Sequence, residues 1–182
     1  MSRTSLLLRF FAFAAVCAVG LAVAAEDADP ALGLQAPEGF QVATFATDDW
    51  ATNVSAMTVD PRGRVVVAGP GYIKILHDDD ADGRADRASL FADFPRSSAH
   101  GLCFDPTGPH PVLLCTGDNG VWRLEDRDGD DRADPNPTRL VELGHSEHGA
   151  NGVVQGPDGD YYVLCGNDAG LDKLGGLDPS SP

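Results

Sequence analysis

The chain has 182 residues, enough for one domain of ordinary size. Its 28 acidic residues outnumber 13 basic ones, and the formal net charge is −15. A polyanion without a Lys/Arg cluster repels phosphate backbones and anionic headgroups, which excludes nucleic-acid partners and docking on an anionic membrane face. A hydrophobic content of 42% indicates a folded chain, and 21 glycines with 13 prolines indicate many turns.

Residues 1–25 have the three-part layout of a secretory signal peptide. Arg3 and Arg9 form a basic start, an uncharged apolar run follows over residues 10–25, and small residues close it at 22–25. The alternative is an uncleaved membrane anchor, but about 16 apolar residues are at the short end for a membrane span. We therefore expect export to the periplasm, the cell surface or the medium, with a linker at residues 26–38.

Three cysteines remain after removal of the signal peptide: Cys103, Cys115 and Cys165. None forms a CxxC pair, which argues against a zinc knuckle and against covalently attached haem. At most one internal disulfide can form, and we expect all three to be small buried residues on strands.

A turn signature recurs three times along the chain, at residues 60–63 (DPRG), 105–108 (DPTG) and 156–159 (GPDG). Each copy is followed by a short apolar run, at residues 65–68, 112–115 and 161–165. After the first two copies come a second strand pattern, an acidic loop and a last strand pattern. These lie at residues 72–76, 78–86 and 88–91, and again at 121–124, 126–134 and 138–143.

Each repeat therefore predicts four short strands within 45–51 residues, the size of one β-propeller blade. We predict an all-β fold, a partial β-propeller. A β-sandwich is the structural alternative, but it does not explain why the turn and the acidic loop recur together.

The predicted blades cover residues 53–94, 99–143 and 150–182, the last one truncated, within a domain at 39–182. Residues 39–47 (GFQVATFAT) indicate a lone strand of the kind that closes a ring by joining the last blade. Propellers have about four to eight blades, and about two and a half cannot close a ring. We therefore expect the amino-terminal part of a larger propeller.

The first acidic loop, residues 78–86, fits the pattern DxDxDGxxD. Five oxygen ligands fall within it: the carboxylates of Asp78, Asp80, Asp82 and Asp86 and the main-chain carbonyl of Arg84. Such an oxygen cage favours Ca²⁺. The twelfth position is Ser89 instead of the glutamate of an EF-hand, and the flanks are strand-like, so we predict a structural calcium loop on a β-hairpin.

The second acidic loop repeats the spacing with the candidate ligands Asp126, Asp128, Asp130 and Asp134. Asp131 stands where the first loop has Gly83, which makes the bend harder and the second site weaker. A solvated acidic turn is the alternative for both loops. Four carboxylates within nine residues repel one another without a cation, which favours calcium.

Residues 145–159 (HSEHGANGVVQGPDG) precede the third apolar run, which in a propeller places them at the mouth of the central channel. A histidine beside a carboxylate suits general-base chemistry, and HxxH could alternatively supply two metal ligands. From the residues alone, a functional site and a polar channel lining are both open.

This segment, with its GPDG turn and the DGRAD-type loops, resembles the quinoprotein glucose/sorbosone dehydrogenase superfamily, and more closely the bacterial membrane-bound dehydrogenase propellers. The resemblance covers about residues 34–170. It implies a six-bladed propeller that binds pyrroloquinoline quinone (PQQ) with Ca²⁺ assisting, oxidises a sugar, polyol or aldose, and passes electrons to a cytochrome-type acceptor. It implies His148 as the catalytic base with Glu147 beside it, and His100 and Asn151 as cofactor contacts.

The chain departs from the dehydrogenase pattern in two respects. Known glucose dehydrogenases have a basic residue shortly after the catalytic histidine, where Asn151 and Gly152 stand here. The other cationic contacts to the cofactor lie on later blades of the family. A non-catalytic, calcium-stabilised propeller that binds a carbohydrate or protein partner, and an inactive fragment, are therefore alternatives to an enzyme.

Overall fold

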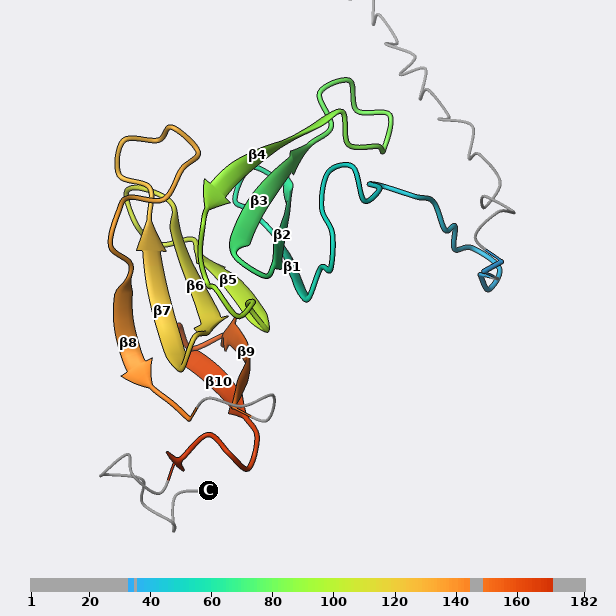
Figure 1. The fold of residues 1–182 in the computed structure, drawn as a ribbon. Helices are drawn as coiled ribbons and strands as arrows, with labels where there is room; N and C mark the ends of the chain where they lie inside the picture. Colours follow the sequence, from blue (N-terminus) through green and yellow to red (C-terminus); the bar gives the residue numbers. More distant parts are fainter. Residues whose placement is uncertain (1–32, 35, 145–148, 172–182) are drawn as a thin grey trace, which may run out of the picture. The chain divides into compact units, whose positions relative to one another are not determined.

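The computed structural model describes residues 33–34, 36–144 and 149–171 of the chain. The described residues form ten β-strands in three antiparallel sheets and contain no α-helix (Figure 1). The prediction of an all-β fold is therefore confirmed. The predicted signal peptide and the predicted catalytic pair, Glu147 and His148, lie outside the described residues.

By its contacts the chain divides into two compact units, residues 1–43 and residues 44–182. In the described part of the first unit, a turn forms in which the Phe40 amide donates to the Pro37 carbonyl at 3.0 Å. All ten strands belong to the second unit. No helical segment with the length and hydropathy needed to cross a bilayer is found among the described residues.

The strands pair in chain order within each sheet. The first sheet consists of β1 (Ala56–Val59), β2 (Val65–Gly69), β3 (Tyr72–His77) and β4 (Arg87–Ala92). The second sheet consists of β5 (Gly101–Asp105), β6 (Val112–Gly117), β7 (Gly120–Glu125) and β8 (Thr138–Glu142). The third sheet pairs β9 (Ala150–Gln155) with β10 (Tyr161–Cys165).

Local hydrogen bonds reverse the chain at the predicted turns. In the first turn, the Asp60 carboxylate accepts a hydrogen bond from the Arg64 amide at 2.8 Å, and Gly63 has a φ of +85°, which disfavours any side chain. In the second turn, Asp105 accepts one from the Thr107 amide at 2.8 Å. The apolar runs that flank these turns then pair as antiparallel strands, where the sequence predicts them.

The first two strands have the same register in all three sheets. The equivalent pairs are Ala56 with Ala68, Gly101 with Thr116, and Gly152 with Leu164. Because side chains alternate between the two faces of a strand, equal register places equivalent residues on equivalent faces. The three sheets are therefore structural repeats of one another.

Each sheet has a front face, which we define as the face directed at the following sheet, and a back face directed at the preceding one. One core joins the front of the first sheet to the back of the second and includes Val66, Ala68, Ile73 and Ile75 with Leu102, Leu113, Cys115 and Leu124. A smaller core joins the second sheet to the third and includes Val121 and Leu143 with Ala150, Val163 and Cys165.

Residues 39–47 form no strand, so the prediction of a lone strand there is wrong. Residues 45–51 pack by their side chains on the back face of the first sheet, where Val67 and Leu76 are buried. The Lys74 ammonium group donates to the Trp50 carbonyl at 2.8 Å. A strand requires regular main-chain hydrogen bonds to a neighbouring strand. The apolar residues at 45–51 instead pack their side chains against the first sheet.

Cys103, Cys115 and Cys165 lie on β5, β6 and β10 and are free thiols. Cys115 is fully buried in the core between the first two sheets, and its burial raises the pKa of its thiol. Cys103 and Cys165 are half-buried, so the expectation of a buried cysteine holds for Cys115 alone.

Candidate functional site

The first acidic loop joins β3 to β4 and brings three of its predicted ligands together. One carboxylate oxygen from each of Asp78, Asp80 and Asp86 lies within 4.8 Å of the other two. These are hard oxygen donors, as Ca²⁺ requires. Asp82 lies outside this group, and its carboxylate accepts a hydrogen bond from the Arg84 amide at 2.8 Å.

Main-chain amides hold the three carboxylates in place. The Asp82 amide lies 3.1 Å from Asp78 Oδ1 and 3.2 Å from Asp80 Oδ1. The Asp79 amide donates to Asp86 Oδ2 at 2.7 Å. Each carboxylate oxygen has a second lone pair, so these bonds leave acceptor capacity for a cation.

The second acidic loop, between β7 and β8, also brings three carboxylates together, those of Asp126, Asp128 and Asp130. Its third member is the fifth residue of the loop, whereas the third member of the first group, Asp86, is the ninth. Asp126 is fully buried, and its carboxylate accepts hydrogen bonds from the amides of Gly129 at 2.8 Å and of Asp130 and Asp131 at 3.2 Å. Burial raises the pKa of Asp126, and these amides act in the opposite direction. Asp126 is therefore the fixed point around which this loop folds.

Both loops contain two left-handed backbone positions, and the glycine stands at a different one in each. In the first loop Ala81 has a φ of 61° and Gly83 a φ of +86°. In the second loop Gly129 has a φ of +75° and Asp131 a φ of 65°. Asp131 thus adopts the bend that its glycine counterpart adopts, at the cost of a less favourable backbone conformation.

The Asp131 side chain joins the second loop to the first sheet. Its carboxylate accepts hydrogen bonds from Arg64 Nη1 at 2.6 Å and Arg64 Nη2 at 2.8 Å, and from Arg62 Nη1 at 2.8 Å. Arg64 Nε also donates to the buried Asp60 at 2.7 Å. The hydrogen bonds from Arg64 lower the pKa of Asp131. Sequence patterns did not reveal this cluster, which depends on packing between two repeats.

The predicted cofactor contacts His100 and Asn151 lie at one end of the first strands, where the second and third sheets meet. Each precedes a glycine, and a Cβ added to Gly101 would lie 2.7 Å from the Cα of Gly152, so the two backbones are in direct contact. The equivalent residue in the first sheet is Ser55, whose hydroxyl donates to the Ala99 carbonyl at 2.7 Å. Each repeat therefore has a polar residue at the equivalent end of its first strand.

A family model for a domain of unknown function, DUF7133, matches residues 28–176. The chain belongs to the DUF7133 family. No curated protein and no solved structure matches it. The match spans both acidic loops, the three turns and the segment with Glu147 and His148 in one DUF7133 domain.

PQQ carries three carboxylates, so a site for it in this DUF7133 domain calls for cationic partners. Ser55, His100 and Asn151 offer a hydroxyl, an imidazole and an amide, and none of them is an arginine or lysine. The described residues at this end therefore do not fit the quinone by themselves.

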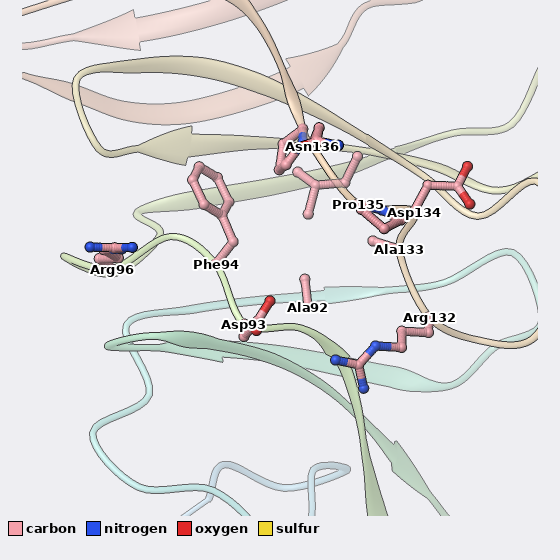
Figure 2. Close-up of a pocket in the computed structure, with 11 residues that line it drawn as sticks. Ala92, Asp93, Phe94, Arg96, Arg132, Ala133, Asp134, Pro135 and Asn136 are labelled. Carbon is pink, nitrogen blue, oxygen red and sulfur yellow. The ribbon is translucent and has the colours of Figure 1, made fainter.

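The DUF7133 domain also has a pocket of about 440 Å³, which lies between the end of β4 and residues 132–137, the end of the second acidic loop and the residues after it (Figure 2). Its charged lining residues are Asp93, Arg96, Arg132 and Asp134, and Phe94 contributes an aromatic wall. The predicted calcium ligand Asp134 lines this pocket and lies outside the group formed by its loop. No sequence motif marks the pocket, because its walls come from two separate repeats.

Proposed function

We propose that this chain is part of a calcium-stabilised β-propeller, in which the three sheets are successive blades and the two acidic loops bind Ca²⁺. The observation that supports this proposal most strongly is that each of the two acidic loops brings three carboxylates together, Asp78–Asp80–Asp86 in the first loop and Asp126–Asp128–Asp130 in the second. The first and third residues of the loop belong to both groups, and an oxygen-donor group in each of two repeats favours a shared ligand over chance crowding.

Calcium at these loops has a structural role in this proposal. Without a cation, the carboxylates of each group repel one another at separations below 4.8 Å. A cation in the second loop also fixes Asp131, and through Arg64 it fixes the turn of the first sheet. Calcium binding is therefore expected to stabilise the packing between sheets as well as the loops.

The test is a calcium titration of the purified chain. Calorimetry measures calcium binding, and thermal unfolding measures the melting temperature at each calcium concentration. A ligand that binds only the folded state raises the melting temperature, and a chelator reverses the rise. Asp80→Asn and Asp128→Asn should each remove one binding site, whereas Asp93→Asn, an exposed aspartate outside both groups, should remove none. The proposal would be refuted if neither calcium nor chelator changes the melting temperature.

A second candidate function is the oxidation of a sugar, polyol or aldose in the manner of the quinoprotein dehydrogenases. The sequence order favours it: the segment with Glu147 and His148 leads directly into β9, which begins at Ala150 and carries Asn151. PQQ would supply the redox chemistry when bound. The resemblance assigns removal of the hydroxyl proton to His148, and transfer of electrons onward to a cytochrome-type acceptor.

Quinone-dependent dye reduction with a panel of aldoses tests this second candidate, with His148→Ala against His110→Ala as the matched control. Loss of turnover in His148→Ala alone would support an enzyme. Equal turnover in both variants would refute the role of His148. If the unsubstituted protein shows no turnover, the enzyme hypothesis is refuted and the calcium-stabilised binding module is the function that stands. Amino-terminal sequencing of the exported protein tests the proposed cleavage after residue 24 or 25.

A further inference from the structure

The pocket beside Phe94 has no role in either proposed function. Its volume, about 440 Å³, is within the range of small-molecule sites, roughly 300–1,000 Å³. Ala92 and Leu124, which line it, belong to the core between the first two sheets. Both walls therefore lie within the described residues, and a further blade of the proposed propeller, which would follow the third sheet, would not cover the pocket.

Hydrogen bonds to main-chain amides fix both walls of the pocket. The Ala133 amide donates to the Phe91 carbonyl at 2.8 Å and joins the loop wall to the end of β4. On the β4 wall, the Arg96 amide donates to the Asp118 carboxylate at 2.7 Å. The pocket is therefore formed before a ligand binds, which lowers the entropic cost of binding.

Phe94 provides a rigid aromatic surface in the pocket. Its ring packs edge to face on Trp122, with ring centroids 5.0 Å apart and an interplanar angle of 69°. The Trp122 indole nitrogen in turn donates to the Gly117 carbonyl at 2.9 Å. Phe94 is only half-buried, so its ring offers apolar contact area to a flat ligand, such as the C–H face of a sugar ring.

The polar groups of the pocket are available to a ligand. Four of its polar side chains have no hydrogen-bond or ion-pair partner among the described residues, those of Asp93, Arg96, Arg132 and Asn136. Asp134 differs, because Arg127 Nη1 lies 3.2 Å from its Oδ2 and offsets its charge. Figure 2 shows the Arg132 side chain extending from the loop wall toward Asp93.

The charge of the pocket favours a ligand with one negative charge. Its unpartnered charged groups are two arginines and one aspartate, which leaves one net positive charge in a chain whose total is −15. A carboxylate balances that charge, and a guanidinium group binds it through two parallel hydrogen bonds. A phosphate monoester carries about −1.5 to −2 at neutral pH, which would leave excess negative charge beside Asp93.

The remaining polar groups suit a ligand with several hydroxyls. The Asp93 carboxylate only accepts hydrogen bonds, the Arg132 guanidinium group only donates, and the Asn136 amide does both. A sugar hydroxyl also donates and accepts, so it can pair with each of these groups. The pocket thus combines an aromatic surface, a site for one carboxylate and partners for hydroxyls.

We propose that this pocket binds a uronic acid, a sugar whose ring carries one carboxylate. The sugar ring packs on Phe94. The carboxylate binds Arg96, because Arg132 extends toward Asp93, which offsets its charge. The site uses none of the carboxylates grouped in the two acidic loops and none of the predicted catalytic residues, so it rests on neither proposed function.

Calorimetric titration of the full chain, in calcium-containing buffer, tests the proposal with glucuronate, glucose and glucose 6-phosphate. These probes share one ring and differ in carrying a carboxylate, a hydroxymethyl group or a phosphate. Glucuronate should bind about tenfold or more tightly than the other two, because only it gives a charge-assisted hydrogen bond without excess charge. No binding of glucuronate up to about 10 mM, or equal or tighter binding of either other probe, would overturn the proposal.

Substitutions assign the binding to this pocket. Arg96→Gln should weaken glucuronate binding about tenfold or more, and Phe94→Leu should weaken it about fivefold through loss of the aromatic surface. Arg87→Gln, at an exposed arginine of β4 outside the pocket, is the matched control and should bind as the original chain does.

Circular dichroism confirms that each variant is folded, and Asn136→Ala, at an exposed loop position, replaces Phe94→Leu if that variant misfolds. If Arg96→Gln binds glucuronate as tightly as the original chain, or if Arg87→Gln weakens binding as much as Arg96→Gln does, the proposed site is wrong.

Discussion

Arg64, at the turn before β2, and Asp131, in the second acidic loop, form a doubly hydrogen-bonded ion pair between residues 67 positions apart in the chain. The two side chains are 21% and 27% exposed. Arg64 also donates to the buried Asp60, so that one guanidinium group connects a turn of the first sheet with a loop of the second. The pair therefore holds two repeats together outside their apolar core.

Removal of this ion pair should destabilise the protein. Asp131→Ala leaves Arg64 without its partner in the second loop, and we expect it to lower the free energy of unfolding by roughly 1–3 kcal/mol. Asp131→Gly loses the same bonds but relieves the left-handed backbone, with a φ of 65° at this residue, so it should cost about 1 kcal/mol less than alanine. Urea unfolding of both variants measures the difference. Equal losses would show that the backbone conformation at residue 131 carries no strain.

The contact between the second and third sheets should tolerate a methyl group at one glycine and not at the other. In Gly101→Ala, the new Cβ would lie 2.7 Å from Gly152 Cα and 2.8 Å from the Val153 nitrogen, so main chain must move. We expect a loss of about 1–3 kcal/mol.

Gly152→Ala is the matched control, because its Cβ would meet only Leu164 Cβ at 3.6 Å, an ordinary contact. Thermal unfolding should show a lower melting temperature for Gly101→Ala and little change for Gly152→Ala. Equal melting temperatures for the two variants would contradict the close approach of the Gly101 and Gly152 backbones.

Acid should destabilise the second turn, because protonation of the Asp105 carboxylate weakens the hydrogen bonds that it accepts there. Thr107 lowers the pKa of the Asp105 carboxyl, chiefly because its hydroxyl donates to the carboxylate at 2.5 Å and also because its amide donates at 2.8 Å. A carboxyl with a lowered pKa contributes stability above its unfolded pKa, about 3.9, and loses that contribution as the pH falls through its folded pKa.

Thr107→Val should therefore raise the pKa of Asp105 towards its ordinary value. The difference in free energy of unfolding between the original protein and this variant should be full at about pH 6 and should shrink below about pH 4. Thr138→Val, at an exposed threonine on β8, is the control. A difference that stays constant over this pH range would contradict the assigned cause, and NMR titration of the carboxyl group would check it directly.

The strands could be predicted because their signals are local. The turn at residues 60–63 reverses the chain by bonds within five residues, and the apolar runs beside it are short and regular. The convergence of Asp78, Asp80 and Asp86 was also predictable, since one tight loop contains all three.

The rest depends on contacts between repeats, which no local pattern encodes. Arg64 and Asp131 meet only because the second loop folds over the turn of the first sheet. Residues 39–47 have the composition of a strand but form none, and residues 45–51 pack by their side chains on the back face of the first sheet. The pocket beside Phe94 likewise takes its walls from two repeats.

The two acidic loops have consequences for recognising related sequences. One loop has its glycine at the sixth position and the other at the fourth, yet both bend at the same two places. A search pattern that insists on glycine at a single position would find one loop of this chain and miss the other. A pattern that accepts glycine at either position, with the aspartates at their fixed spacing, describes both loops. The sequence of such a loop can therefore change at these two positions while its backbone conformation stays the same.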